Sequence, residues 1–125
     1  MKTEPTRKRI DLPCVLVVED LQTALELETR LMPFPVLRAD GLVPASEHLV
    51  TLAPFVTIVG GKRAKELVSC LAELAKAMMS ELVTVDQLGC GEVAANRVEA
   101  LLMKAGTRRA RSSSIPRNAQ ARVPR

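Results

Sequence analysis

The sequence predicts an α/β domain with a doubly wound, all-parallel sheet. Four short aliphatic runs alternate with four helical patterns along the chain, and the connections between them are short. The runs are continuously apolar, which is typical of strands that helices cover on both faces. Strict alternation of this kind favours parallel strands joined by right-handed crossovers, so both faces of one sheet are expected to carry helices.

Two strand–helix units make up the first half of the chain. The run at 14–18 is rich in β-branched residues and is followed closely by Asp20, a preferred N-cap residue. The helix that Asp20 opens ends at the prolines of 33–35. A short second strand is expected at 36–39 and a second helix at 44–53.

Two further units make up the second half of the chain. One strand is expected at 55–59 and another at 81–85. The segment 65–79 has apolar residues at spacings of three and four and is the clearest helix of the chain. The last helix is expected at 92–106, because glycine, here Gly106, is typical of the position just after a helix end.

The charges divide the chain into three segments. Residues 1–9 carry four basic residues and one acid, and residues 106–125 carry six arginines and no acid. The segment between them carries eight basic and thirteen acidic residues, so the body is acidic although the whole chain has a net charge of +4. We therefore expect a basic N-terminal extension at 1–12, a domain at 13–106 and a disordered basic tail at 107–125.

The three cysteines are widely spaced and form no C-x-x-C motif. An odd number of separate cysteines predicts free thiols in a reducing compartment, so a cytoplasmic protein is expected. Cys14 and Cys70 have apolar neighbours and are expected in the core, as are Met78, Met79 and Met103. No apolar run approaches the roughly 18 residues that span a bilayer, so no contact with a membrane is expected.

Acidic residues and glycines stand where each expected strand ends. They are Glu19 and Asp20, Asp40, Gly60 and Gly61, and Asp86. The carboxyl ends of parallel strands meet at one edge of a sheet, and folds of this class bind their ligands there. Any chemistry of this chain is therefore expected at that edge.

The order of these segments resembles a response-regulator receiver domain over most of residues 13–106. VLVVEDLQTALELETRLM is similar to the family's first strand, acidic pair and first helix, and VLRADGLVPASEHL to its second strand, turn and second helix. APFVTIVGG and ELVTVDQ have the positions of its third and fourth strands, and RVEALLMKAG resembles its fourth helix. The resemblance implies a flavodoxin-like sheet whose fifth strand would fall in RRARSSSIPR. Arginine and serine stand there in place of a strand, so the fifth strand and the last helix are in doubt.

The resemblance also implies a phosphorylation site that this chain has lost. In the family, the acidic pair and an acceptor aspartate hold Mg²⁺ while a phosphoryl group moves onto that aspartate. Glu19 and Asp20 match the acidic pair, whereas the acceptor position falls on Gly60, which has no side chain to phosphorylate. The family's hydroxyl residue after the fourth strand falls on Asp86. The resemblance therefore implies a degenerate receiver that phosphorylation does not switch.

Several interpretations of these site residues stay open. Glu19 and Asp20 form either a solvated strand end with a helix N-cap, or a weak Mg²⁺ site to which Asp86 adds a carboxylate. No other cofactor is expected. The segment GGKRAKE at 60–66 is either an anion cradle of backbone amides, a helix N-terminus and the side chains of Lys62, Arg63 and Lys65, or a tight turn with solvated charges. A further alternative is that Lys62 pairs with one of the two acids.

Three functions are weighed against these features. The first is a protein–protein interaction module in two-component-type regulation, whose partner is a histidine kinase, an output protein or a second copy of the chain. The second is a small nucleic-acid-associated protein, which binds through its Arg-rich tail or through a β-α-β-α unit at 55–106 that distantly resembles the Alba-type fold. The third, an enzyme, is not expected, because the sequence holds no nucleophile–base set, metal cluster or cofactor motif.

Overall fold

Four parallel strands form the centre of the molecule. The computed structural model describes the backbone of residues 13–122 and the side chains of residues 13–111. The strands are β1 (Val15–Val18), β2 (Val36–Ala39), β3 (Val56–Val59) and β4 (Glu81–Thr84). They pair in the order β2-β1-β3-β4, and every pair is parallel. The predicted doubly wound parallel sheet, with the strand order of a flavodoxin-like fold, is therefore confirmed.

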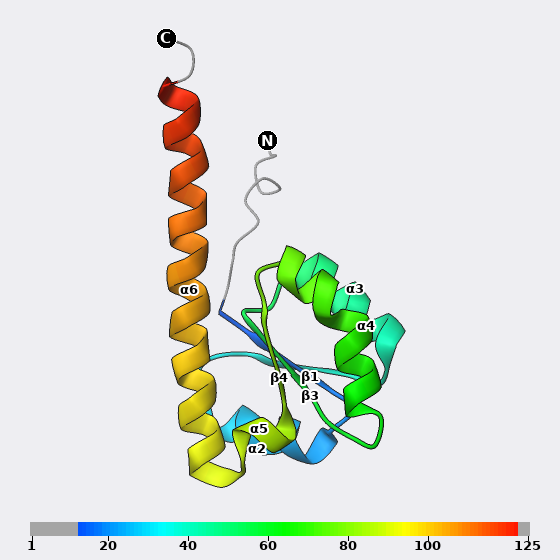
Figure 1. The fold of residues 1–125 in the computed structure, drawn as a ribbon. Coiled ribbons are helices and arrows are strands. Elements are labelled where there is room, and N and C mark those ends of the chain that lie inside the picture. The colour runs from blue at the N-terminus through cyan, green and yellow to red at the C-terminus, as the bar shows by residue number, and fades with distance from the viewer. Residues whose placement is uncertain (1–12, 123–125) are drawn as a thin grey trace, which may run out of the picture.

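Helices cover both faces of this sheet. They are α2 (Leu21–Arg30), α3 (Leu42–Leu52), α4 (Ala64–Ala77), α5 (Val85–Leu88) and α6 (Gly91–Arg122). Figure 1 shows α2, α5 and α6 on one side of the strands and α3 and α4 on the other. Val15 and Val17 of β1 belong to the core on the α2 side, and Leu16 and Val18 to the core on the α3 side. All four are at most 1% exposed, which explains why their run is apolar without interruption.

The strands end level with one another at their carboxyl ends. Val18 of β1 pairs with Ala39 of β2 and with Val59 of β3, and Val59 in turn pairs with Thr84 of β4. The loops that follow these four residues therefore begin at one edge of the sheet, as the sequence predicts.

The last helix departs from the expected boundary. The other expected strands and helices agree with the structure to within two residues at each end, but α6 runs through Gly106 to Arg122. The helix end expected at Gly106 is therefore wrong, because the backbone is helical as far as Arg122. The division of the chain at residue 106 into a domain and a basic tail stays a prediction. The basic extension expected at 1–12 lies outside the described residues.

Arg109 fastens the second half of α6 to the amino end of the sheet. Its guanidinium donates hydrogen bonds to the carbonyl oxygens of Pro54 at 3.0 Å, Met78 at 2.9 Å and Met79 at 3.1 Å. The same group lies over the ring of Phe55, 4.2 Å from the ring centroid. One side chain thus satisfies three carbonyls at the connections that lead into β3 and β4, and the cation is also attracted to the ring. This anchor keeps the chain helical beyond a glycine that favours a helix end.

Glu81, the first residue of β4, is a second point at which α6 is attached. Its carboxylate accepts a hydrogen bond of 2.6 Å from the guanidinium of Arg108, and Nζ of Lys104 lies 3.8 Å away. The Glu81 side chain is only 14% exposed, so these cations shield it from water. Residues on both sides of Gly106 therefore belong to the folded body.

Two residues that were expected in the core are exposed. Cys70 lies on the solvent side of α4, because the sheet covers a narrow stripe of Leu67, Leu71 and Ala75 beside it. Met103 is 73% exposed on α6. Cys14 is buried as expected, and the three cysteines are free thiols.

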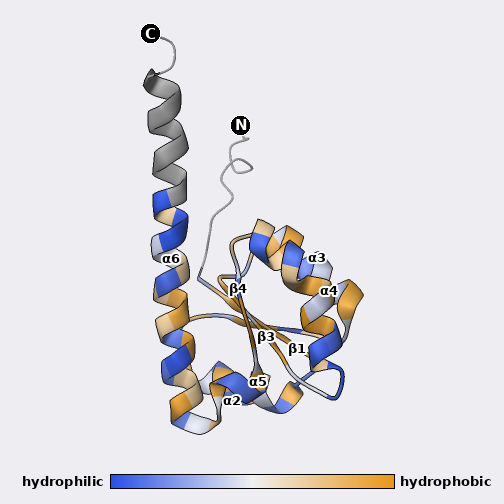
Figure 2. Ribbon diagram, viewed as in Figure 1, coloured by the Kyte–Doolittle hydropathy of each residue, from blue (hydrophilic) through white to orange (hydrophobic). Residues whose placement is uncertain are grey.

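The buried side of α6 is narrow and consists mostly of small residues. They are Ala94, Ala95, Val98, Leu102 and Ala105. Figure 2 shows hydrophilic residues between the hydrophobic ones along this helix. Within the described part of the chain, no helix is both long enough and apolar enough to cross a membrane.

Replacing Arg109 with alanine is expected to lower the free energy of unfolding by about 2–4 kcal/mol, because three partly buried carbonyls lose their donor and Phe55 loses its contact with the cation. The matched control is Arg111→Ala, which removes an exposed arginine from the same helix and should change stability by no more than about 0.5 kcal/mol. Urea unfolding followed by circular dichroism measures both effects. Equal effects of the two substitutions would show that Arg109 does not anchor the helix.

Candidate functional site

The edge at the carboxyl ends of the strands brings together the residues that the sequence singles out. A cavity of about 130 Å³ lies there. Its lining residues are Asp20, Val59, Gly60, Gly61, Ala64, Thr84, Val85 and Asp86. Glu19 borders the same place, since its backbone oxygen is 3.1 Å from the point that a Cβ at Gly61 would occupy. The prediction that these strand-end residues meet at one edge is confirmed.

Asp20 caps helix α2, as its place in the sequence predicts. Oδ1 of its carboxylate accepts a hydrogen bond of 3.0 Å from the backbone N–H of Thr23. This bond satisfies one of the amides that have no partner within the helix. One carboxylate oxygen is thus committed to the start of α2, while Oδ2 faces Gly60.

Gly60 has no room for a side chain. A Cβ at this position would lie 2.6 Å from Oδ2 of Asp20, 2.8 Å from Cβ of Asp20 and 2.9 Å from Cγ2 of Val85. The backbone cannot easily retreat, because the buried Gly60 donates its N–H to the carbonyl of Val18 at 3.0 Å. Packing therefore requires a glycine here, and any larger residue would displace its neighbours.

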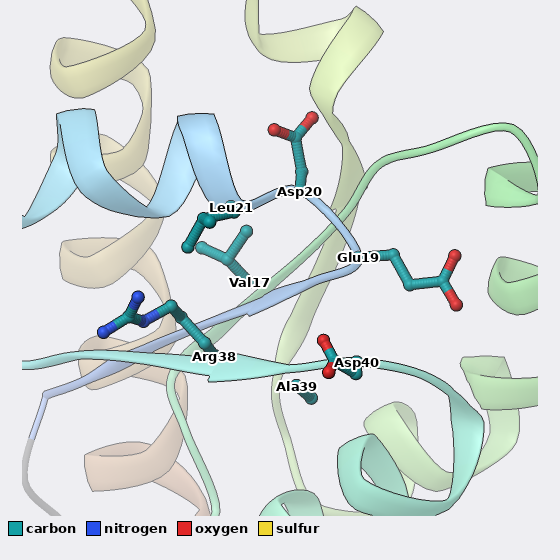
Figure 3. A pocket seen from close by; sticks show the side chains of 7 residues that line it. All are labelled: Val17, Glu19, Asp20, Leu21, Arg38, Ala39 and Asp40. Atoms are coloured by element: carbon teal, nitrogen blue, oxygen red, sulfur yellow. The ribbon is translucent and has the colours of Figure 1, made fainter.

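Glu19 points away from Asp20. Its φ of 58° lies in the left-handed region that residues with a side chain seldom adopt, and this turn separates the two side chains. The carboxylate of Glu19 lies near Gly41 and Gly61, 3.8 Å and 3.4 Å from the points that their Cβ atoms would occupy. Figure 3 shows the carboxylates of Glu19 and Asp20 directed to different sides. The two acids do not present their oxygens to one common point.

A second, larger cavity of about 310 Å³ opens beside Glu19 on the side of β2 (Figure 3). Its lining residues are Val17, Glu19, Asp20, Leu21, Arg38, Ala39 and Asp40. Arg38 lies 3.9 Å from Glu28 of α2, so its charge is partly matched within the domain. The walls carry three carboxylates and one guanidinium, so acidic groups are in excess around this cavity.

The metal and anion interpretations of this edge stay predictions. Within residues 13–111, no three His, Cys, Asp or Glu side chains lie together in a way that could hold a metal ion. Lys62 and Asp86 are both exposed. Among the described residues, no ion pair joins Lys62 to Glu19 or Asp20, and that alternative stays a prediction too. Lys62 and the turn before it remain candidates for contact with an anion.

Thr84 is a residue of this edge that the sequence reading missed. It ends β4, and its hydroxyl accepts a hydrogen bond from the N–H of Gln87 at 3.3 Å, while Oε1 of Gln87 accepts one from the N–H of Thr84 at 2.9 Å. This capping box starts α5, on which Asp86 is exposed. The side chain that places a hydroxyl group at the end of β4 is therefore Thr84, two residues before Asp86. The T-x-x-Q spacing of TVDQ is the signal that could have revealed both the cap and α5.

Cys14 lies at the other end of the sheet and is buried. Burial raises the pKa of the Cys14 thiol, and the charge of Arg109 and the backbone N–H of Phe55 oppose this effect only in part. A thiol with a raised pKa holds little thiolate at neutral pH, and the thiolate is the nucleophile. The free cysteine of the core thus has a packing role.

The chain matches no protein-family model, no curated protein and no solved structure. The resemblance to receiver domains therefore rests on the order and spacing of segments in this sequence. The structure adds three observations. The strands end level with one another, Asp20 caps α2, and a side chain at position 60 would have no space.

Gly60→Ala is expected to lower the free energy of unfolding by about 1–3 kcal/mol, because the added methyl overlaps Asp20 and Val85. Gly106→Ala is the matched control. Its Cβ would lie 3.5 Å from Phe55, an ordinary contact, and alanine favours a helix interior by about 1 kcal/mol. Thermal unfolding should therefore shift in opposite directions for the two variants. A Gly60→Ala variant as stable as the wild type would mean that the space at Gly60 is open.

Proposed function

We propose that the chain is a pseudo-receiver, a receiver-like domain that acts in two-component-type signalling without being phosphorylated. The strand order, the acidic pair at the end of β1 and the cavity between β1, β3 and β4 support this proposal. Its place of action is the cytoplasm, where cysteines stay reduced, and its three free thiols agree with that. Its activity is the binding of another protein.

The observation that carries the proposal is the closed space at Gly60. A phosphoryl acceptor at the end of the third strand needs a carboxylate side chain, but even a methyl group at Gly60 would overlap Asp20 and Val85. Asp20 also uses one carboxylate oxygen to cap α2. The residues of this edge thus stabilise the fold. We therefore expect the domain to bind its partner through its outer surface.

The outer edge of β4 supports a binding role. Among the described residues, no strand pairs with the side of β4 that faces away from β3. The four residues of β4 are half-buried, whereas every residue of β1 and β3 is buried. An edge strand presents N–H and C=O groups with which a strand of another chain can pair. The candidate partners are a histidine kinase, an output protein and a second copy of the chain.

Phosphotransfer assays test the proposed function. Incubation with acetyl phosphate and Mg²⁺, or with an autophosphorylated histidine kinase, is expected to leave the intact mass of the chain unchanged, because no carboxylate stands at position 60. A receiver domain with its acceptor aspartate is the positive control. Stable acyl phosphate on Glu19, Asp20 or Asp86 would overturn the proposal.

Nucleic-acid binding through the end of α6 is a second candidate function. Residues 107–125 hold six arginines and no acid, and the backbone is helical as far as Arg122. Figure 1 shows this end of α6 extending beyond the sheet. A basic helix that projects from an acidic body attracts the phosphate backbone of a nucleic acid without reading its sequence.

Deleting residues 112–125 tests this second candidate. The deletion keeps Arg108 and Arg109, whose contacts hold α6 to the body, so the domain should stay folded. If the end of α6 binds nucleic acid, the deletion should lower the affinity for mixed-sequence duplex DNA by about tenfold or more and reduce its dependence on salt. Fluorescence anisotropy measures both quantities. Unchanged binding would exclude the end of α6 as the contact.

A further inference from the structure

The side of α6 that faces away from the sheet has a regular pattern of its own. Its exposed residues Val93, Asn96, Ala100, Met103, Thr107 and Ala110 form what we call the outward seam. They recur at alternating spacings of three and four residues, which is the spacing of a coiled-coil seam. Val93 and Met103 are 53% and 73% exposed, so the seam offers apolar surface to a second helix.

Charges of opposite sign flank the outward seam. Glu92 and Glu99 lie seven residues apart on one flank, and both are exposed. Arg97, Lys104 and Arg111 lie on the other flank with the same repeat of seven, and they are exposed too. With the seam residues at the a and d positions of a heptad, the acidic flank takes the g positions and the basic flank takes the e positions. Side chains at e and g set the orientation of paired helices.

This charge pattern selects the orientation of a second α6. In a parallel pair, Glu99 of one copy faces Lys104 of the other, and Glu92 faces Arg97, so opposite charges meet. In an antiparallel pair, the acidic flanks would face each other and so would the basic flanks, which is destabilising. The pattern is therefore complementary to an identical helix that runs in the same direction.

An apolar groove adjoins the acidic flank of the outward seam. It has a volume of about 480 Å³, and its lining residues are Pro13, Phe34, Phe55, Glu99, Leu102, Met103 and Gly106. In the parallel pair, Lys104 of the second copy comes to Glu99 at the border of this groove. Its aliphatic stem then covers apolar wall while its ammonium group reaches the carboxylate.

We propose that two copies of this chain associate in parallel through the outward seams of α6. The inference rests on the proposed binding role, for which it names the partner and the surface. The outward seam lies opposite the buried side of α6, so each body stays on the outer side of the helix pair. Lys104 is 64% exposed despite its contact with Glu81, so a second copy can reach it.

The Glu99–Lys104 pair is the place to test the association, because Arg97 already donates hydrogen bonds to the carbonyls of Gln87 and Leu88. Analytical ultracentrifugation of the full chain should show a dimer at micromolar concentration. Glu99→Lys and Lys104→Glu should each weaken that dimer by about tenfold or more, because like charges then meet. An equimolar mixture of the two variants should form a heterodimer, since each introduced charge then faces one of opposite sign.

The matched control is Glu73→Lys, which makes the same change of charge at an exposed position of α4 and should leave the dimer intact. Circular dichroism checks that every variant is folded. A monomeric wild-type chain overturns the inference, as does a dimer that neither substitution weakens or a mixture that stays monomeric. None of these results depends on phosphotransfer, so labelling of the chain would overturn the proposed function separately.

Discussion

The attachment of Arg109 to the amino end of the sheet holds α6 in place, and much of the molecule depends on it. One guanidinium binds carbonyls at the connections into β3 and β4 and covers the ring of Phe55. A helix whose buried side is mostly alanine gains little from apolar area alone, so a polar anchor has a large share in fixing its position. With α6 fixed, the sheet is covered on its second face.

The two ends of the sheet differ in their chemistry. The amino end is closed by cations of α6, which bind carbonyls and the carboxylate of Glu81. The carboxyl end, where α/β folds commonly bind ligands, is crowded at Gly60 and carries a carboxylate that serves as a helix cap. One packing arrangement thus leaves no space for a side chain at position 60 and stabilises the start of α2.

The position of α6 also decides which surfaces stay free. The helix lies on the face of the sheet that carries α2 (Figure 1), and β4 is an edge strand among the described strands. The outward seam stays exposed for the same reason, since the sheet meets only one narrow side of α6. A parallel pair of chains would use the seam and leave the β4 edge free for a second protein.

The sequence by itself determined the number of strands, their order along the chain and their parallel direction. Continuous aliphatic runs separated by helical patterns allow few topologies. It also determined the cap at Asp20 and the edge where the strand ends meet, since both depend on local spacing. The tertiary structure alone decided the course of α6 past Gly106, the closed space at Gly60 and the divergence of Glu19 from Asp20. Arg109 reaches carbonyls 31 and 55 positions away, and Gly60 is crowded by residues of other elements. Contacts between residues so distant in the chain leave no periodicity in the sequence, so they arise only when the layers pack.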